Sequence, residues 1–263
     1  MSSLSLAVRD SSTMLRRNLL HARRYPSLTL NLLLTPIMLL LLFVYVFGDV
    51  MSAGMGAGGA DRAAYIAYLV PGLLLMTVGS TTIGTAVSVS NDMTEGIIAR
   101  FRTMAIHRGS VLIGHVVGSV LQAVLSVLLV GAVGVAIGFR STDATPLEWL
   151  AAFGLLTLFA LALTWIAVGM GMVSPSAEAA SNNAMPLIFL PLISSAFVPV
   201  DAMPGWFQPI AQYQPFTPAI ETLRGLLLGT EIGDNWWITL LWCVGLAVLG
   251  YRWSKSVFNR DAA

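Results

Sequence analysis

Few side chains in this sequence could perform catalysis. Lys255 is the only lysine, and although Ser256 follows it, Ser254 precedes it and no glycine-rich run leads into it. The chain therefore lacks the loop that cradles nucleotide phosphates. It contains no Gly-x-Ser-x-Gly elbow and no His-Glu-x-x-His motif, and metal-ligand spacing is absent among His21, His107 and His115. We expect no catalytic residue, no metal and no cofactor bound by this chain itself.

One polar stretch, residues 91–108, separates two apolar runs that are each long enough to cross a bilayer. Asp92 or Thr94 could cap a helix that begins there, and Glu95 suits its first turn. Its apolar residues recur at four-residue spacing: Ile97, Phe101 and Ala105. Its basic residues are Arg100, Arg102 and Arg108. The pattern predicts a short helix over 92–105 that docks in a groove of another protein or, with nearly equal weight, lies on anionic lipid.

The elements that would position this stretch are membrane spans. Hydrophobic residues make up 56% of the 263 positions and charged residues 10%, against roughly 25% charged in an ordinary soluble domain. A helix needs about 20 apolar residues to cross the hydrocarbon of a bilayer. Six stretches meet or approach this length: 28–47, 64–89, 111–139, 147–173, 183–200 and 236–251. We therefore expect an all-α integral membrane protein that forms one domain over 1–263.

Basic residues are distributed unequally about these spans. Of the 14 lysines and arginines, all but Arg62, Arg140 and Arg224 fall on the side that holds both termini. The positive-inside rule places that side, and residues 92–105 with it, in the cytoplasm. Residues 4–24 would form an amphipathic interfacial helix along the inner leaflet, or else a disordered basic tail.

The second span carries a mildly polar stripe at helical spacing, made up of Thr77, Thr81, Thr85, Ser88 and Asp92. The first four are candidates for lining a substrate path. Their hydroxyls could equally bond to carbonyls of their own helix. We find no charged or histidine side chain in the apolar interiors of the six spans, which disfavours a transporter driven by protons or ions.

Seven of the twelve prolines fall between residues 186 and 218. They break the fifth predicted span, 183–200, and with the aromatic residues beside them they predict re-entrant, broken helices over 201–230. One such helix would run from Thr217 to Gly229, with Glu221 and Arg224 paired on its exposed side. The candidate outer gate consists of Pro199, Pro204, Trp206, Phe207, Glu221 and Arg224. Trp206 could instead be only an interfacial anchor.

Two parts of the sequence carry a resemblance to a known family. The first is Met-Thr-Glu-Gly-Ile-Ile-Ala-Arg-Phe-Arg-Thr-Met at 93–104. The second is Pro-Leu-Ile-Ser-Ser-Ala-Phe-Val-Pro at 191–199, followed by Met-Pro-Gly-Trp at 203–206 and Pro-Phe-Thr-Pro-Ala-Ile-Glu-Thr-Leu-Arg at 215–224. In this order they resemble the membrane subunits of type-2 ABC exporters, in the daunorubicin/doxorubicin-resistance permease branch. The family usually has proline after the residue matching Met104, whereas this chain has Ala105, so the helix could continue for another turn.

The resemblance implies a division of labour. Two membrane subunits, identical or homologous, would sit on two ATPase subunits that bind ATP and Mg²⁺, and the helix between spans two and three would couple to the ATPase. The coupling residues it implies are Glu95, Ile97, Arg100, Phe101, Arg102 and Met104. The permease would form the path of an amphipathic drug-like or lipid-like compound across a bacterial cytoplasmic membrane. It would contact membrane lipid and bind no nucleic acid. The alternative is a non-transporting accessory protein that recruits a cytoplasmic partner.

Overall fold

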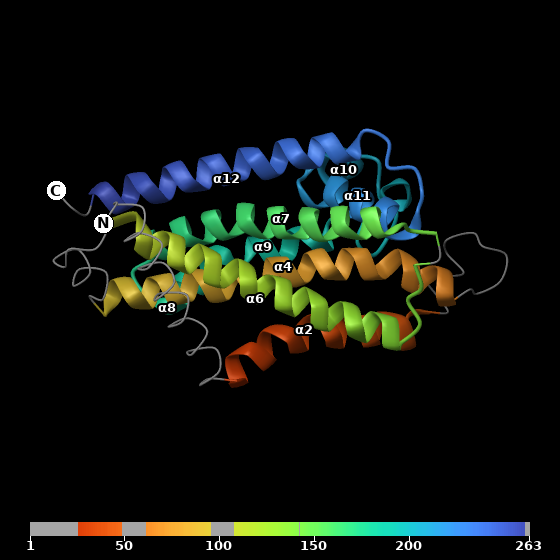
Figure 1. Cartoon of the computed structure of the whole chain (residues 1–263), viewed down its shortest axis with the longest axis horizontal. Coiled ribbons are helices and arrows are strands. Elements are labelled where there is room, and N and C mark those ends of the chain that lie inside the picture. The colour runs from red at the N-terminus through yellow and green to blue at the C-terminus, as the bar shows by residue number, and fades with distance from the viewer. Residues whose placement is uncertain (1–25, 49–61, 96–107, 142, 261–263) are drawn as a thin grey trace.

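Every regular element is a helix in the residues that the structure, a computed structural model, describes: 26–48, 62–95, 108–141 and 143–260 (Figure 1). No strand occurs in these ranges. The long helices are α2 (Pro26–Tyr45), α4 (Arg62–Thr94), α6 (Arg108–Ala136), α7 (Pro146–Val173) and α12 (Asn235–Arg260). The short ones are α8 (Ala177–Ala184), α9 (Pro186–Leu192), the 3-10 helix η1 (Val200–Ala202), α10 (Gln208–Tyr213) and α11 (Phe216–Leu228). The predicted interfacial helix at 4–24 lies outside the described residues.

Four helices in the described ranges are long and apolar enough to cross a membrane: Arg62–Thr94, Leu112–Ala136, Pro146–Val173 and Asn235–Asn259. They coincide with the second, third, fourth and sixth predicted spans. The 20-residue α2 overlaps the first predicted span. Helix α4 has 33 residues, a length of about 50 Å at 1.5 Å per residue. It is therefore longer than the predicted span 64–89 and longer than a hydrocarbon layer of ~30 Å.

The fifth predicted span, 183–200, is not one helix. Helix α8 ends at Ala184, α9 has only seven residues, and turns lead from α9 to η1. A proline lacks the N–H that continues a helical ladder, so Pro186, Pro191 and Pro199 interrupt this stretch. Seven helical residues rise only about 10 Å, too little to cross a bilayer. The total of six spans therefore stays a prediction.

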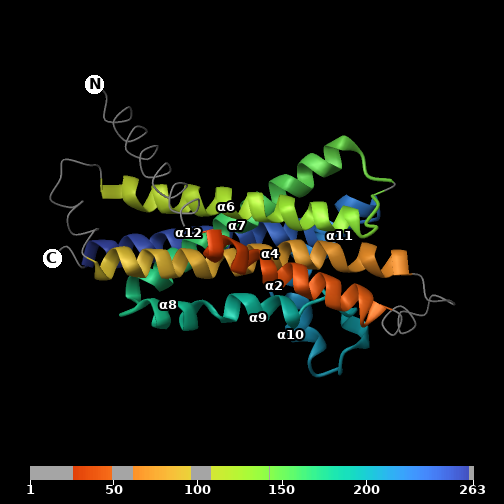
Figure 2. The same ribbon diagram turned by 90° about the horizontal axis from the view of Figure 1, so that it is seen from below.

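Helix α4 is the centre of the bundle. Every residue from 69 to 82 is buried, and the helix contacts α2, α6, α7, α8, α9 and α11. In Figure 2, α6, α7 and α12 lie to one side of α4, and α8 and α9 lie to the other. A Cβ on Gly72 would lie 2.7 Å from the Cα of Ala196, and one on Gly79 would lie 2.7 Å from the carbonyl oxygen of Leu187. The segment that contains α9 therefore packs directly on the backbone of α4.

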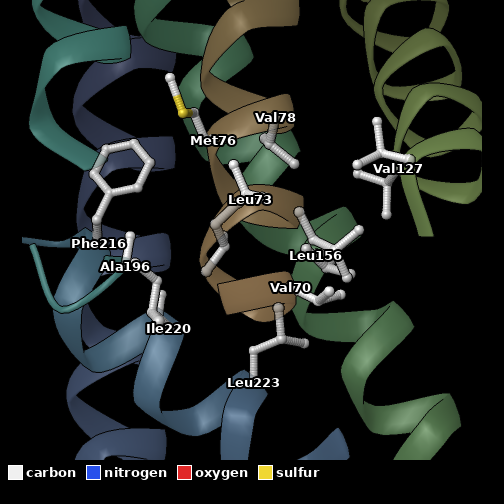
Figure 3. Close-up of a cluster of buried hydrophobic side chains, with 14 of the residues drawn as sticks. Val70, Leu73, Met76, Val78, Val127, Leu156, Ala196, Phe216, Ile220 and Leu223 are labelled. Atoms are coloured by element: carbon white, nitrogen blue, oxygen red, sulfur yellow. The ribbon is translucent and has the colours of Figure 1, made fainter. Parts of the chain in front are cut away.

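The apolar core extends to both sides of α4. Figure 3 shows Phe216 and Ile220 of α11 on one side of Leu73, and Leu156 of α7 and Val127 of α6 on the other. All five side chains belong to one buried cluster. The short helix α11 is thus held by the same core as the long helices.

Helices α7 and α12 pack closely at two glycines. A Cβ on Gly250 would lie 2.8 Å from the backbone nitrogen of Ile166, and Trp253 covers Gly169. The Ser254 hydroxyl adds a hydrogen bond of 3.1 Å to the carbonyl oxygen of Trp165. These contacts fix the register of the two helices.

The two ends of the bundle differ. At one end, on the left in Figures 1 and 2, α4 ends, α6 begins and α12 ends. We call the end of α4 together with the start of α6 the α4–α6 junction. Helices α10 and α11 lie at the opposite end, which we call the α11 end. The α11 end contains Glu221 and Arg224 of the predicted outer gate, and the α4–α6 junction flanks residues 96–107, which lie outside the described residues.

Candidate functional site

The α4–α6 junction is where the predicted coupling helix would be attached. The Thr94 hydroxyl donates hydrogen bonds to the carbonyl oxygens of Ser90 and Asn91, at 3.0 and 3.1 Å. The backbone N–H of Glu95 donates to Asn91 as well, at 2.9 Å. Thr94 therefore completes α4, and the exposed Glu95 lies in the turn that follows. The remaining predicted coupling residues lie outside the described ranges: Ile97, Arg100, Phe101, Arg102 and Met104.

The sequence pattern did not predict a hydrogen-bonded pair of side chains at this junction. His115 Nε2 lies 2.9 Å from Asp92 Oδ2, and the two side chains are only 6% and 10% exposed. Asp92 is in the last turn of α4, and His115 is in the second turn of α6. Because His115 falls inside the predicted span 111–139, the expectation that the spans contain no histidine is wrong. The available signal was a single histidine in an apolar run, together with an aspartate in register with the hydroxyl stripe.

A separate apolar cluster adjoins this hydrogen-bonded pair. Val89 precedes Asp92 by nearly one turn of α4, and Leu112 precedes His115 by nearly one turn of α6; both are buried in a cluster with Phe258 of α12 and residues of α7. Burying an unpaired charge in such surroundings is costly. The pairing of Asp92 with His115 therefore favours the observed alignment of α4 with α6.

The hydroxyl stripe of α4 faces the interior of the subunit. Thr77, Thr81 and Thr85 are buried, and their hydroxyls donate to the carbonyl oxygens of Leu73, Val78 and Thr81, at 2.7, 2.8 and 3.4 Å. Ser88 is partly buried. Of the two interpretations left open by the sequence, bonding within the helix is present in this conformation for the three threonines. Lining of a substrate path by these residues stays a prediction.

Arg224 forms the main polar network at the α11 end. Its Nη2 donates to the carbonyl oxygens of Tyr68 and Ser195, at 3.1 and 3.0 Å, and its Nη1 lies 2.6 Å from Glu221 Oε1. The guanidinium carbon lies 3.7 Å from the centre of the Tyr68 ring. The Tyr68 hydroxyl in turn donates to the Ser195 carbonyl oxygen at 2.8 Å. One arginine thus joins α11, α4 and the turn after α9.

The predicted pairing of Glu221 with Arg224 is present, but it is not on an exposed side of the helix. The Arg224 side chain is 11% exposed and points to α4, while that of Glu221 is 34% exposed. The helix begins at Phe216 and ends before Gly229, whose left-handed φ of 66° closes it as expected. Tyr68 and Ser195 were missed because their parts in the network are mostly backbone carbonyls, which no residue pattern reveals.

The other predicted outer residues lie between α9 and α10. Pro199 precedes η1, and the carbonyl oxygen of Pro204 accepts a hydrogen bond from the N–H of Phe207 at 2.8 Å. Trp206 is 76% exposed, and its ring contacts that of Phe207 edge-on at 5.4 Å between centroids. A large exposed aromatic side chain suits a membrane interface. Nothing in its contacts ties it to the Arg224 network.

A metal site is not found in the described part of the chain: no three His, Cys, Asp or Glu side chains come together there. Asp92 and His115 bring together two such side chains, one fewer than such a group requires. The polar side chains at both ends of the bundle instead connect one helix to another.

Comparison with known proteins shows the family of this chain. Residues 10–228 match the ABC-2 type transporter family. The chain belongs to this family. It is 30% identical over 247 residues to the daunorubicin resistance ABC transporter permease protein DrrB1 of Streptomyces coeruleorubidus, which covers 92% of this chain and 83% of the relative. It is 25% identical over 226 residues to the probable doxorubicin resistance ABC transporter permease protein DrrC of Mycobacterium tuberculosis, with 82% and 80% covered.

A third relative comes from another biological setting. Nodulation protein J of Rhizobium meliloti is 26% identical over 208 residues, with 72% of each chain covered. Together with the family match, the relatives make this chain the multi-pass membrane subunit of an ABC exporter. Members of this family work in a dimeric arrangement with an ATPase partner, and the permease subunits are not themselves ATPases.

Proposed function

We propose that this permease, paired with a second copy or with a homologous permease, exports an amphipathic drug-like or lipid-like compound across a bacterial cytoplasmic membrane. Two ATPase subunits would bind ATP and Mg²⁺ and drive the transport. The similarity to two drug-resistance permeases supports this substrate class. Daunorubicin is therefore the first substrate to test.

The observation that carries the proposal is the continuity of α4. This single helix contains both Tyr68, which belongs to the Arg224 network, and Thr94, its last residue, where the predicted coupling segment begins. Its one proline, Pro71, lies close to the Tyr68 end. From there to Thr94 the helix is uninterrupted, so a displacement at one end would be passed on to the other. The permease thus has a direct mechanical connection between the end expected to meet the ATPase and the end where the outer segment closes the bundle.

At the coupling end, we place residues 94–104 in a cleft of the ATPase, with both termini of the permease in the cytoplasm. Ile97 and Phe101 would be the buried apolar contacts. The other contacts would come from Glu95, Arg100, Arg102 and Met104. At the α11 end, the Arg224 network would hold the outer segment against α4 until transport moves it, while Trp206 and Phe207 contact the lipid interface.

Replacing Ile97 and Phe101 together with aspartate tests the coupling. Charged side chains cannot occupy an apolar groove without losing hydration, so the ATPase should dissociate from membranes and ATP-dependent daunorubicin export should fall roughly ten-fold or more. Co-purification of the ATPase and fluorescence of exported daunorubicin measure the two effects. The matched control replaces both residues with leucine, which keeps the contacts apolar and should retain the ATPase. Undiminished export by the aspartate variant at normal protein levels would contradict the proposed coupling.

A further inference from the structure

The hydrogen-bonded pair of Asp92 and His115 lies where the segment between α4 and α6 is attached. Asp92 is two residues before the end of α4, and His115 is seven residues after the start of α6. The atoms that meet, Oδ2 and Nε2, are 2.9 Å apart and shielded from solvent. With Asp92 ionised, its carboxylate can only accept, so Nε2 carries the hydrogen. The bond joins the two helices near the ends that flank residues 96–107.

We propose that Asp92 and His115 are positioning residues for energy coupling: their pairing makes the end of α4 and the start of α6 move as one unit when the ATPase displaces the segment between them. This inference rests on the proposed function, because it concerns how that segment transmits motion. It assigns a role to two residues that lie outside the predicted docking surface of Ile97 and Phe101.

The packing around the pair supports a mechanical role. Val89 and Met93 of α4 and Leu112 and Val116 of α6 form one apolar cluster with side chains of α7 and α12. Apolar side chains can slide past one another at small cost, whereas a charge-assisted hydrogen bond has a fixed length and direction. The pair is therefore a directional contact between α4 and α6 in the described part of this junction. Without it, a displacement of one helix end can be absorbed between the helices rather than passed along α4.

Two substitutions of His115 separate hydrogen bonding from packing. His115→Gln keeps an N–H donor close to the position of Nε2, whereas His115→Leu fills similar space without a donor. His115→Leu should lower the daunorubicin exported per ATP hydrolysed, on the order of three- to ten-fold, while the ATPase stays bound. The His115→Gln permease should export nearly as much daunorubicin per ATP hydrolysed as the wild type. Ser254→Ala is the matched control, because it removes a buried hydrogen bond between α12 and α7 and should leave the ratio unchanged.

A measurement without substrate tests the motion itself. Cys243 is the only cysteine, so Cys243→Ala gives a background for spin labels at Asn91→Cys on α4 and Val117→Cys on α6, both exposed positions. In the full complex, the distance between labels should be the same without nucleotide and with ATP and vanadate. His115→Leu should make that distance shift or broaden on ATP binding.

The possible results are distinct. A wild-type permease that binds no ATPase would overturn the proposed function rather than this inference. If the ATPase is bound, two results would overturn this inference and leave the proposed function standing. One is a His115→Leu permease that exports as much daunorubicin per ATP hydrolysed as the wild type and whose label distance does not change with ATP. The other is an equal loss of coupling in Ser254→Ala. If His115→Leu does not accumulate, the double exchange Asp92→His with His115→Asp decides. If the double exchange restores coupling to near the wild-type level, the proposed role of the pair is supported. If it assembles normally but exports little daunorubicin per ATP hydrolysed, that role is contradicted.

Discussion

At the scale of the residue, Arg224 shows how one cation can be buried in a membrane protein. Charged side chains inside a membrane are costly unless they are paired or bound to carbonyls. Arg224 meets both conditions, because it pairs with Glu221 and donates to the carbonyl oxygens of Tyr68 and Ser195. Its planar guanidinium also covers the Tyr68 ring. The geometry uses the fork of donors that distinguishes arginine from lysine.

We therefore expect Arg224→Lys to be destabilising although it keeps the charge. A lysine cannot reach both carbonyls and Glu221 at once, and the buried acceptors left unpaired should cost roughly 1–3 kcal/mol. Thermal unfolding of the purified permease and daunorubicin export measure the effects, and both should decrease. Arg140→Lys is the control, since the two described hydrogen bonds of Arg140 go to the nearby carbonyl oxygens of Val135 and Phe139 and join no second helix. Equal stability of the two variants would show that the network is dispensable.

At the scale of the element, one face of α4 receives the segment from α9 to the turn beyond it. Tyr68 and Gly72 are four residues apart, so they lie on the same face. There the Tyr68 hydroxyl bonds to Ser195, and Gly72 allows the backbone of Ala196 to approach. Gly79, two turns further along, admits the carbonyl of Leu187. The broken helices are thus fixed to the central helix by contacts with its backbone.

Gly72→Ala should disturb this contact. The added Cβ would lie 2.7 Å from the Cα and Cβ of Ala196, so the turn must move, and overpacking of this kind costs about 1–3 kcal/mol. A lower unfolding temperature in detergent is the expected result. The control is Gly154→Ala in α7, where a Cβ meets nothing within 4 Å and the substitution should be neutral or slightly stabilising. A Gly72→Ala permease as stable as Gly154→Ala would contradict the close packing.

At the scale of the whole molecule, the sequence predicted the parts that depend on local signals. Helix α7 was predicted at 147–173 and occupies Pro146–Val173, because its apolar run has clear ends; Thr145 and Glu148 cap the first turn reciprocally. Contacts between distant segments were not predictable in this way. His115 meets Asp92 only because the chain returns after the intervening segment, and Arg224 points inward only because α4 lies beside α11. The break in the fifth predicted span follows from its prolines, but the resulting short helices depend on their packing against α4.

The most direct test of ATP-driven export is transport by the reconstituted complex. The permease would be purified with its ATPase, placed in proteoliposomes and supplied with ATP on the side of the ATPase. We predict that daunorubicin accumulates inside the vesicles only when ATP and the intact permease are both present, and that the variant with aspartate at Ile97 and Phe101 shows none of this accumulation. Accumulation that is equal without ATP, or equal in that variant, would contradict an export function driven through this helix.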